Sequence, residues 1–322
     1  LSRSLAFFDL IFESKKTKVR DRVDDVNRGG GRVNSEKTYL ITPSWTAVIE
    51  IHFEISNISR IMSWPKVILF GDSLTQRSFD PSLGCWASML ADRYQRRADV
   101  IVRGFSGYNS RWCRMIMPKI FEKFDPNEIF AIVILLGTND SVPVHCDSGQ
   151  HVPIEEYRGN LKFMIDYLQM IGFGPEKLIL MAPPNFYHDD FKQWCKTNNR
   201  ISIPDDWPDQ IKHYVEACKS VAIEKQITSI DLYEIFINNP NNRNLFMDGL
   251  HLSREGAKLL FDNLSILIDE KLERFNLKSM EPLKIFPYWN EIDKNHPEKS
   301  LLCFEKRTRT NNHIVIHSLR ID

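Results

Sequence analysis

The fold of this chain can be worked out from the stretch Ile68-Leu69-Phe70-Gly71-Asp72-Ser73-Leu74-Thr75. Its apolar half has the composition of a buried strand and the Gly-Asp-Ser that follows is typical of a turn, so the sequence predicts a strand that ends at Gly71 and presents Ser73. Near the other end of the folded region, Asp248-Gly249-Leu250-His251 places a carboxylate three residues before a histidine. One tight turn could hold that carboxylate against one ring nitrogen and leave the other nitrogen free to act as a base.

Strand-like and helix-like patterns alternate from Lys66 onward. The predicted strands are 67–70, 100–102, 129–136, 178–181 and 227–232, and the predicted helices are 85–97, 154–171, 211–222 and a last one that opens at Ser253. Residues 129–136 are apolar throughout, as expected of a strand that is covered on both faces. Repeated β-α units predict an α/β fold in which a parallel sheet carries active groups at the carboxyl ends of its strands.

The sequence predicts one folded domain, residues 62–302. Residues 1–61 show no sustained period of either kind and include Gly29-Gly30-Gly31, so we expect a poorly ordered N-terminal extension. Met62 stands just before the first strand, which suggests the hypothesis that the natural protein starts there. Residues 303–322 are predicted to form a C-terminal tail.

Composition excludes several classes of function. The 42 basic and 42 acidic residues cancel, so there is no electrostatic footprint for nucleic acid or for an anionic membrane surface. No apolar run reaches the length of a membrane helix. The cysteines form no C-x-x-C pair and no zinc spacing, so we predict reduced thiols in a cytoplasmic protein and no metal site. They are Cys85, Cys113, Cys146, Cys195, Cys218 and Cys303.

Four segments at predicted strand ends carry the groups that acyl transfer requires. They are the turn with Ser73, the loop 104–109, the loop 137–140 and the turn 248–251. A serine hydroxyl needs a base within reach, which His251 can be if Asp248 fixes its tautomer. The tetrahedral oxyanion needs donors already aimed at it, and the backbone N–H groups of Ser73 and Gly107 and the side-chain amide of Asn139 could supply them.

In these four blocks the chain resembles the SGNH or GDSL-type esterases and lipases. The blocks read Gly71-Asp72-Ser73-Leu74, Ser106-Gly107-Tyr108-Asn109, Gly137-Thr138-Asn139-Asp140 and Asp248-Gly249-Leu250-His251. The resemblance implies Ser73 as nucleophile, Ser73, Gly107 and Asn139 in the oxyanion hole, and His251 with Asp248 as the base pair. It also implies a flavodoxin-like three-layer α/β/α sandwich that uses no cofactor.

A closer resemblance, over about residues 62–302, is to the isoamyl acetate-hydrolysing esterase branch. It is carried by the stretches 103–112 and 248–253 and by Pro287-Tyr288-Trp289. This implies a serine esterase for short-chain, small-molecule esters such as acetates. Lysophospholipids, acyl-thioesters and sugar acetates are used elsewhere in the superfamily and stay open, as does a homodimer.

Each site residue also has a structural interpretation. Ser73 after Asp72 could simply cap a helix, Asn139 could be a turn former, and His251 could be a structural histidine. A non-catalytic binding protein on the same sandwich is therefore the alternative, since fold alone does not guarantee chemistry. A nucleotide-binding flavodoxin-like domain is disfavoured, because the first strand is not followed by a Gly-rich phosphate loop.

The long polar and aromatic connection 185–207 is of the kind that forms a lid or a substrate wall. Several aromatic side chains could either line a substrate pocket or belong to the hydrophobic core, and the sequence favours neither alternative. They are Phe79, Trp112, Phe186, Tyr187 and Trp194. Four histidines are expected on the surface or in loops rather than as metal ligands, namely His145, His151, His188 and His213.

Overall fold

The computed structural model describes residues 64–83, 85–200, 202–274, 288–301, 304–310 and 313–319. The expectations for residues 1–61, including a start at Met62, lie outside the described residues.

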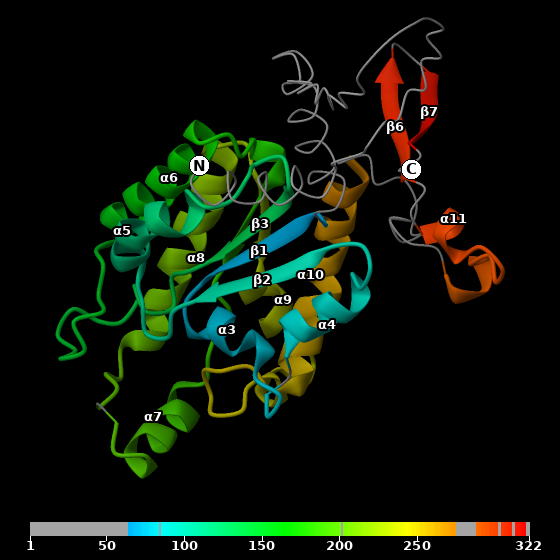
Figure 1. Cartoon of the computed structure of the whole chain (residues 1–322). Coiled ribbons are helices and arrows are strands. Elements are labelled where there is room, and N and C mark those ends of the chain that lie inside the picture. The colour runs from blue at the N-terminus through cyan, green and yellow to red at the C-terminus, as the bar shows by residue number, and fades with distance from the viewer. Residues whose placement is uncertain are drawn as a thin grey trace, which may run out of the picture. The chain divides into compact units, whose positions relative to one another are not determined.

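Five parallel strands form the central sheet. They are β1 (Lys66–Gly71), β2 (Asp99–Gly104), β3 (Ile129–Leu135), β4 (Leu178–Ala182) and β5 (Thr228–Asp231). Their order is β2-β1-β3-β4-β5 (Figure 1). From β1 the chain forms β2 on one side of β1 and then crosses back to form β3 on the other side. The strand order therefore reverses between β1 and β3, and doubly wound folds bind ligands at such a topological switch point. The predicted parallel sheet is confirmed.

Helices cover both faces of the sheet (Figure 1). One face packs against α5 (Ser110–Phe121), α6 (Ile154–Met170) and α8 (Trp207–Glu224). The other packs against α4 (Trp86–Arg93), α9 (Leu232–Ile237) and α10 (Arg254–Arg274). Alternate residues of β1 enter the two cores, Ile68 and Phe70 one of them and Val67 and Leu69 the other. This is the predicted three-layer α/β/α sandwich, and double coverage is why β3 is apolar along its whole length.

Two described helices of ten or more residues were not predicted from the sequence. The first is α5, whose buried residues Cys113, Met117 and Phe121 recur at helical spacing among arginines and Pro118. The second is α7 (His188–Thr197), which lies inside the polar connection 185–207. Both bury only a narrow apolar stripe in an otherwise polar stretch, so no extended apolar pattern marks them in the sequence.

Short elements complete the described chain. They are α3 (Ser73–Gln76), η1 (Arg77–Phe79), η2 (Pro175–Lys177), η3 (Asn242–Leu245), η4 (Trp289–Glu291), α11 (Pro297–Leu301), β6 (Phe304–Thr310) and β7 (His313–Leu319). The last two strands pair with each other in antiparallel register within the segment interpreted as a tail. Among the described helices, none combines the length and the apolar character that a bilayer crossing requires.

Candidate active site

Ser73 lies at the carboxyl end of β1, beside the switch point of the sheet. Asp72 caps the short helix α3, and its Oδ1 accepts a hydrogen bond from the Leu74 N–H at 2.9 Å. Gly71 lets β1 pack tightly against both β3 and α3, because a Cβ there would lie 2.4 Å from the Leu135 carbonyl oxygen on β3 and 2.4 Å from Thr75 Oγ1 on α3. The strand end therefore holds Ser73 in place, and its side chain is mostly buried.

The turn that contains Asp248 and His251 is closed by hydrogen bonds of its own. Asp248 Oδ1 accepts from the backbone N–H groups of Leu250 (3.0 Å) and His251 (2.7 Å). The Met247 N–H donates to the His251 carbonyl at 2.8 Å. Gly249 adopts a φ of +92°, which favours glycine. The side chains of Asp248 and His251 are thereby held together by the turn itself.

The imidazole of His251 lies between a carboxylate and a hydroxyl. Its Nδ1 is 2.7 Å from Asp248 Oδ2, and its Nε2 is 3.2 Å from Ser73 Oγ. All three side chains are buried. With Nδ1–H donating to Asp248, the Nε2 lone pair faces the serine, so His251 can take the hydroxyl proton.

Asp248 stays ionised in this setting. Burial raises the pKa of its carboxyl, but the His251 ring and the backbone N–H groups of His251 and Leu250 lower it by more, and the net pKa lies below its ordinary value. An ionised Asp248 fixes the ring tautomer and can stabilise an imidazolium.

The loop after β2 is bound to the helix that begins with Ser73. The Phe105 N–H donates to the Gly71 carbonyl at 2.8 Å, and the Ser106 N–H donates to Gln76 Oε1 at 2.7 Å. Gly107 follows with a φ of +80°. Its backbone N–H, like that of Ser73, donates to no other residue that the structure describes, so both N–H groups can bind an oxyanion.

Asn139 links the loop after β3 to the same place. One N–H of its amide donates to the Tyr108 carbonyl at 2.8 Å, which leaves its second N–H for another acceptor. The three donors that the sequence singled out therefore lie on loops that contact one another at the carboxyl end of the sheet.

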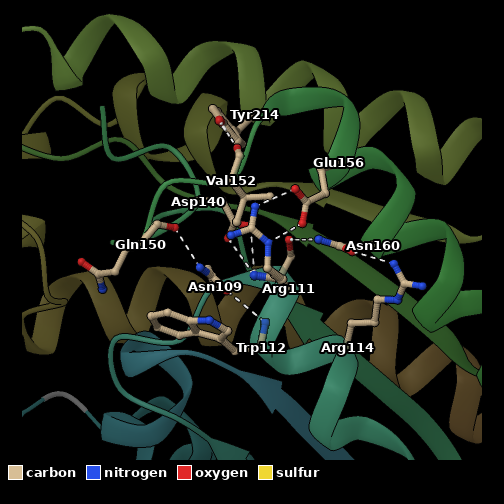
Figure 2. A network of polar contacts seen from close by, with 11 residues as sticks. Asn109, Arg111, Trp112, Arg114, Asp140, Gln150, Val152, Glu156, Asn160 and Tyr214 are labelled. Atoms are coloured by element: carbon tan, nitrogen blue, oxygen red, sulfur yellow. Dashed lines mark hydrogen bonds and ion pairs between the residues drawn. The ribbon is translucent and has the colours of Figure 1, made fainter. Parts of the chain in front are cut away.

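Two further carboxyl groups are buried directly behind these loops. Both oxygens of Asp140 accept from the Ser110 N–H, at 2.9 and 3.1 Å, which fixes the start of α5. Figure 2 shows Asp140 next to Arg111, which itself forms an ion pair with Glu156 on α6. Asp72 is equally buried, and its Oδ2 has no partner among the described residues.

Burial sets the protonation of these two carboxyl groups. It raises the pKa of Asp72 to about 7, helped by the nearby Asp140 and opposed by the hydrogen bond from Leu74. It raises the pKa of Asp140 to about 7 as well, opposed by the hydrogen bonds from Ser110. Both carboxyl groups therefore keep a proton to a much higher pH than Asp248 does.

The connection 185–207 forms a wall beside His251. The ring of Phe191 on α7 meets the His251 ring edge-on, with centroids 6.2 Å apart. The Tyr187 N–H donates to the Gly249 carbonyl at 2.7 Å, so α7 and the histidine turn are joined. Phe191 was not singled out from the sequence, because nothing in the sequence distinguishes it from the other aromatic residues of the connection.

A small, mainly apolar pocket opens beside Ser73 and His251. It is lined also by Leu74, Arg77, Leu83, Cys85, Trp86, Leu252 and Ala257. Trp86 is held in place because its Nε1–H donates to the Leu74 carbonyl at 3.0 Å. None of the five aromatic residues considered from the sequence lines it; Phe186, for example, packs on Trp207 with centroids 4.6 Å apart.

Two of the four histidines considered as ligands are hydrogen-bonded to the backbone. His151 Nδ1 lies 2.7 Å from the Val142 carbonyl, and His188 Nε2 lies 2.8 Å from the Pro204 carbonyl. In the described ranges, no three side chains of His, Cys, Asp or Glu are grouped so that they could hold a metal ion.

Known proteins resemble this chain over most of the described domain. A sequence model of the GDSL-like lipase/acylhydrolase family matches residues 69–259. The isoamyl acetate-hydrolyzing esterase 1 homolog of Homo sapiens is 35% identical over 255 residues, which cover 77% of this chain and 96% of that protein. A GDSL esterase/lipase of Arabidopsis thaliana is 32% identical, with 73% of this chain and 97% of that protein covered.

The fold has also been seen in solved structures. A catalytic mutant of an acetylxylan esterase from Geobacillus stearothermophilus superposes with a TM-score of 0.50 at 19% identity, covering 64% of this chain and 94% of that one. At this level of identity the likeness concerns the fold alone.

Replacing Gly249 by alanine should strain the histidine turn. The residue would keep a positive φ, and its Cβ would lie 2.5 Å from the Tyr187 carbonyl oxygen and 2.6 Å from the Phe191 nitrogen. We expect Gly249→Ala to lower the free energy of unfolding by at least about 2 kcal/mol in urea melts. Gly159→Ala is the matched control: it lies in α6 with nothing within 4 Å of the added Cβ, and should raise stability by up to about 1 kcal/mol. Equal stabilities of the two variants would contradict this account.

The buried carboxyl groups should make the protein less stable as pH rises toward 8. Burial raises the pKa of Asp72 and of Asp140 to about 7 in the folded state, against 3.8 for an ordinary aspartate, so their contribution to stability is complete below pH 4 and is lost between pH 4 and 7. Each group contributes a slope of at most about 1.4 kcal/mol per pH unit. Asp72→Asn should flatten the fall in unfolding free energy between pH 5 and 8, whereas the exposed control Asp147→Asn should not. An unchanged slope in Asp72→Asn would count against the buried-acid interpretation.

Proposed function

The chain belongs to the GDSL-like lipase/acylhydrolase family and is a carboxylic ester hydrolase, and from this premise we propose that it hydrolyses short-chain esters through Ser73, His251 and Asp248. The observation that carries the proposal is the continuous line of contacts from Asp248 Oδ2 through the His251 ring to Ser73 Oγ. A serine becomes nucleophilic when a base lies within hydrogen-bond reach and a third group orients that base.

In the first half of the proposed reaction, Ser73 Oγ attacks the ester carbonyl carbon while its proton passes to His251 Nε2. Asp248 stabilises the resulting imidazolium. The carbonyl oxygen becomes an oxyanion that accepts hydrogen bonds from the N–H groups of Ser73 and Gly107 and from the amide of Asn139. One such donor typically contributes about 3 kcal/mol to lowering the barrier.

Collapse of the tetrahedral intermediate breaks the bond to the alcohol, which leaves with the proton from His251. The acyl group remains on Ser73 Oγ. In the second half, His251 takes a proton from water, the water oxygen attacks the acyl carbonyl, and Ser73 recovers its proton as the acid leaves. Every step uses side chains and backbone N–H groups of this chain and water, with no cofactor.

The pocket beside Ser73 supports a short acyl group. Leu83, Trp86 and Leu252 bound it, and the Trp86 ring is fixed by its hydrogen bond to Leu74. The name of the human relative refers to isoamyl acetate, an ester with a two-carbon acyl group. We therefore assign acetates and similarly short esters as substrates. A cytoplasmic location agrees with the free thiols of the five described cysteines.

Ser73 should be the residue that reacts with a fluorophosphonate probe. Ser73→Ala should abolish labelling and lower kcat on p-nitrophenyl acetate by at least about 10⁴-fold, and Asp248→Asn should lower kcat by about 10³- to 10⁴-fold. Ser229→Ala, an exposed serine on β5, is the control and should be labelled like the wild type. A folded wild type that the probe does not label, or a labelled Ser73→Ala, would refute the assignment.

The size of the pocket should set the acyl preference. The wild type should hydrolyse p-nitrophenyl acetate faster than the hexanoate. Leu83→Ala removes part of the pocket wall and should raise the hexanoate-to-acetate ratio of kcat/KM by about tenfold, since one methylene in a pocket is worth roughly 10- to 200-fold. The control Leu259→Ala, on α10 outside the pocket lining, should leave the ratio unchanged. A wild-type maximum at long acyl chains would contradict the short-chain proposal.

A further inference from the structure

A single glutamine contacts both loops that carry the proposed oxyanion donors. Gln150 lies in the segment before α6, and its Nε2 donates to the Gly107 carbonyl at 2.8 Å and to Asn139 Oδ1 at 3.0 Å. Its two amide hydrogens therefore serve the loop after β2 and the loop after β3.

The contacts leave one orientation for each amide group. The Gly107 and Tyr108 carbonyls can only accept hydrogen bonds. The nitrogen of Gln150 must therefore face Gly107, and the nitrogen of Asn139 must face Tyr108. Asn139 Oδ1 then points to Gln150 Nε2, and the closed ring of contacts keeps that oxygen away from the proposed oxyanion.

The backbone around Gln150 is anchored independently of its side chain. Asn109 Nδ2 donates to the Gln150 carbonyl at 2.9 Å (Figure 2). Two residues later the Val152 N–H donates to the Asp140 carbonyl at 3.1 Å. Asn109 is itself fixed as the N-cap of α5, where its Oδ1 accepts from the Trp112 N–H. The Gln150 side chain thus starts from a fixed point.

We propose that Gln150 is the positioning residue of the oxyanion site, acting through the amide of Asn139 and the peptide of Gly107. The inference rests on the proposed function. Hydrogen-bond donors lower the reaction barrier most when they already point to the site of the oxyanion before its charge develops, because the protein then needs no reorganisation during the reaction. Without Gln150, only the bond to the Tyr108 carbonyl still orients the Asn139 amide, so its second N–H is aimed less firmly at the developing negative charge.

Two variants of similar size remove the two donated bonds. Gln150→Met loses them without adding charge, and Gln150→Glu replaces the donors by acceptors, which should turn the Asn139 nitrogen toward the new carboxylate. We expect each to lower kcat on p-nitrophenyl acetate by about 10- to 100-fold, less than the 10²- to 10³-fold typical of losing a donor outright, with KM within about twofold. Melting temperature is recorded for both.

Affinity for a boronic acid separates positioning from a general structural effect. Phenylboronic acid forms a tetrahedral adduct with an active serine, so its inhibition constant should rise in parallel with the loss of kcat. Gln150→Met should also have a smaller effect on kcat in an Asn139→Ala background than in the intact site, because the two residues act in part through one donor. Gln95→Ala, which changes an exposed glutamine two residues after α4, is the control and should match the wild type within twofold.

The outcomes distinguish the inference from the function on which it rests. Full activity of either folded Gln150 variant, an unchanged boronate inhibition constant, or independent effects with Asn139→Ala would overturn the role of Gln150. If at the same time Ser73→Ala is inactive, the proposed function still stands. An active Ser73→Ala would instead remove the proposed function itself. Parallel losses of kcat and boronate affinity in a folded variant support the inference.

Discussion

An imidazole can pass a proton between a serine and a leaving group only if its ring is held in one orientation, and here a four-residue turn provides that constraint. Asp248 binds both the ring of His251 and two backbone N–H groups of the turn, so the carboxylate orders the loop and the base together. Gly249 lets the turn close against Tyr187 and α7. The serine that His251 contacts lies 178 residues earlier in the chain. Only the parallel sheet, which gathers strand ends at one edge, brings the two together.

The same edge of the sheet buries an unusual amount of polar structure. Asp72, Asn109 and Asp140 have no solvent exposure. Burying such groups is costly unless they are hydrogen-bonded, and each has at least one bond to a loop or helix start near the site. The site therefore consists of two layers. The outer one contains the groups proposed to meet the substrate, and the inner one holds the loops that carry them. Burial, together with the nearby Asp140, raises the pKa of the Asp72 carboxyl and so favours a proton on it.

Much of this arrangement could be predicted from local sequence, and the rest depends on contacts between distant segments. Apolar runs marked the strands, and the spacing of Asp248 and His251 marked a turn that holds its own side chains. The resemblance of four short blocks to one family indicated the oxyanion donors, whose roles stay proposals. By contrast, Gln150 meets Gly107 across 43 residues, and Phe191 meets His251 from a helix that polar residues conceal. Neither contact has a motif signal in the sequence, because each joins residues that are far apart along the chain.

The central claim is that Ser73 carries the acyl group during turnover. The most direct measurement is mass spectrometry of the peptide that contains Ser73, from enzyme quenched in acid during hydrolysis of p-nitrophenyl acetate. The account predicts a peptide heavier by one acetyl group, with the modification located on Ser73, in the wild type but not in Ser73→Ala. Rapid turnover with an unmodified Ser73 peptide, or acetylation at another residue that disappears with activity, would contradict it.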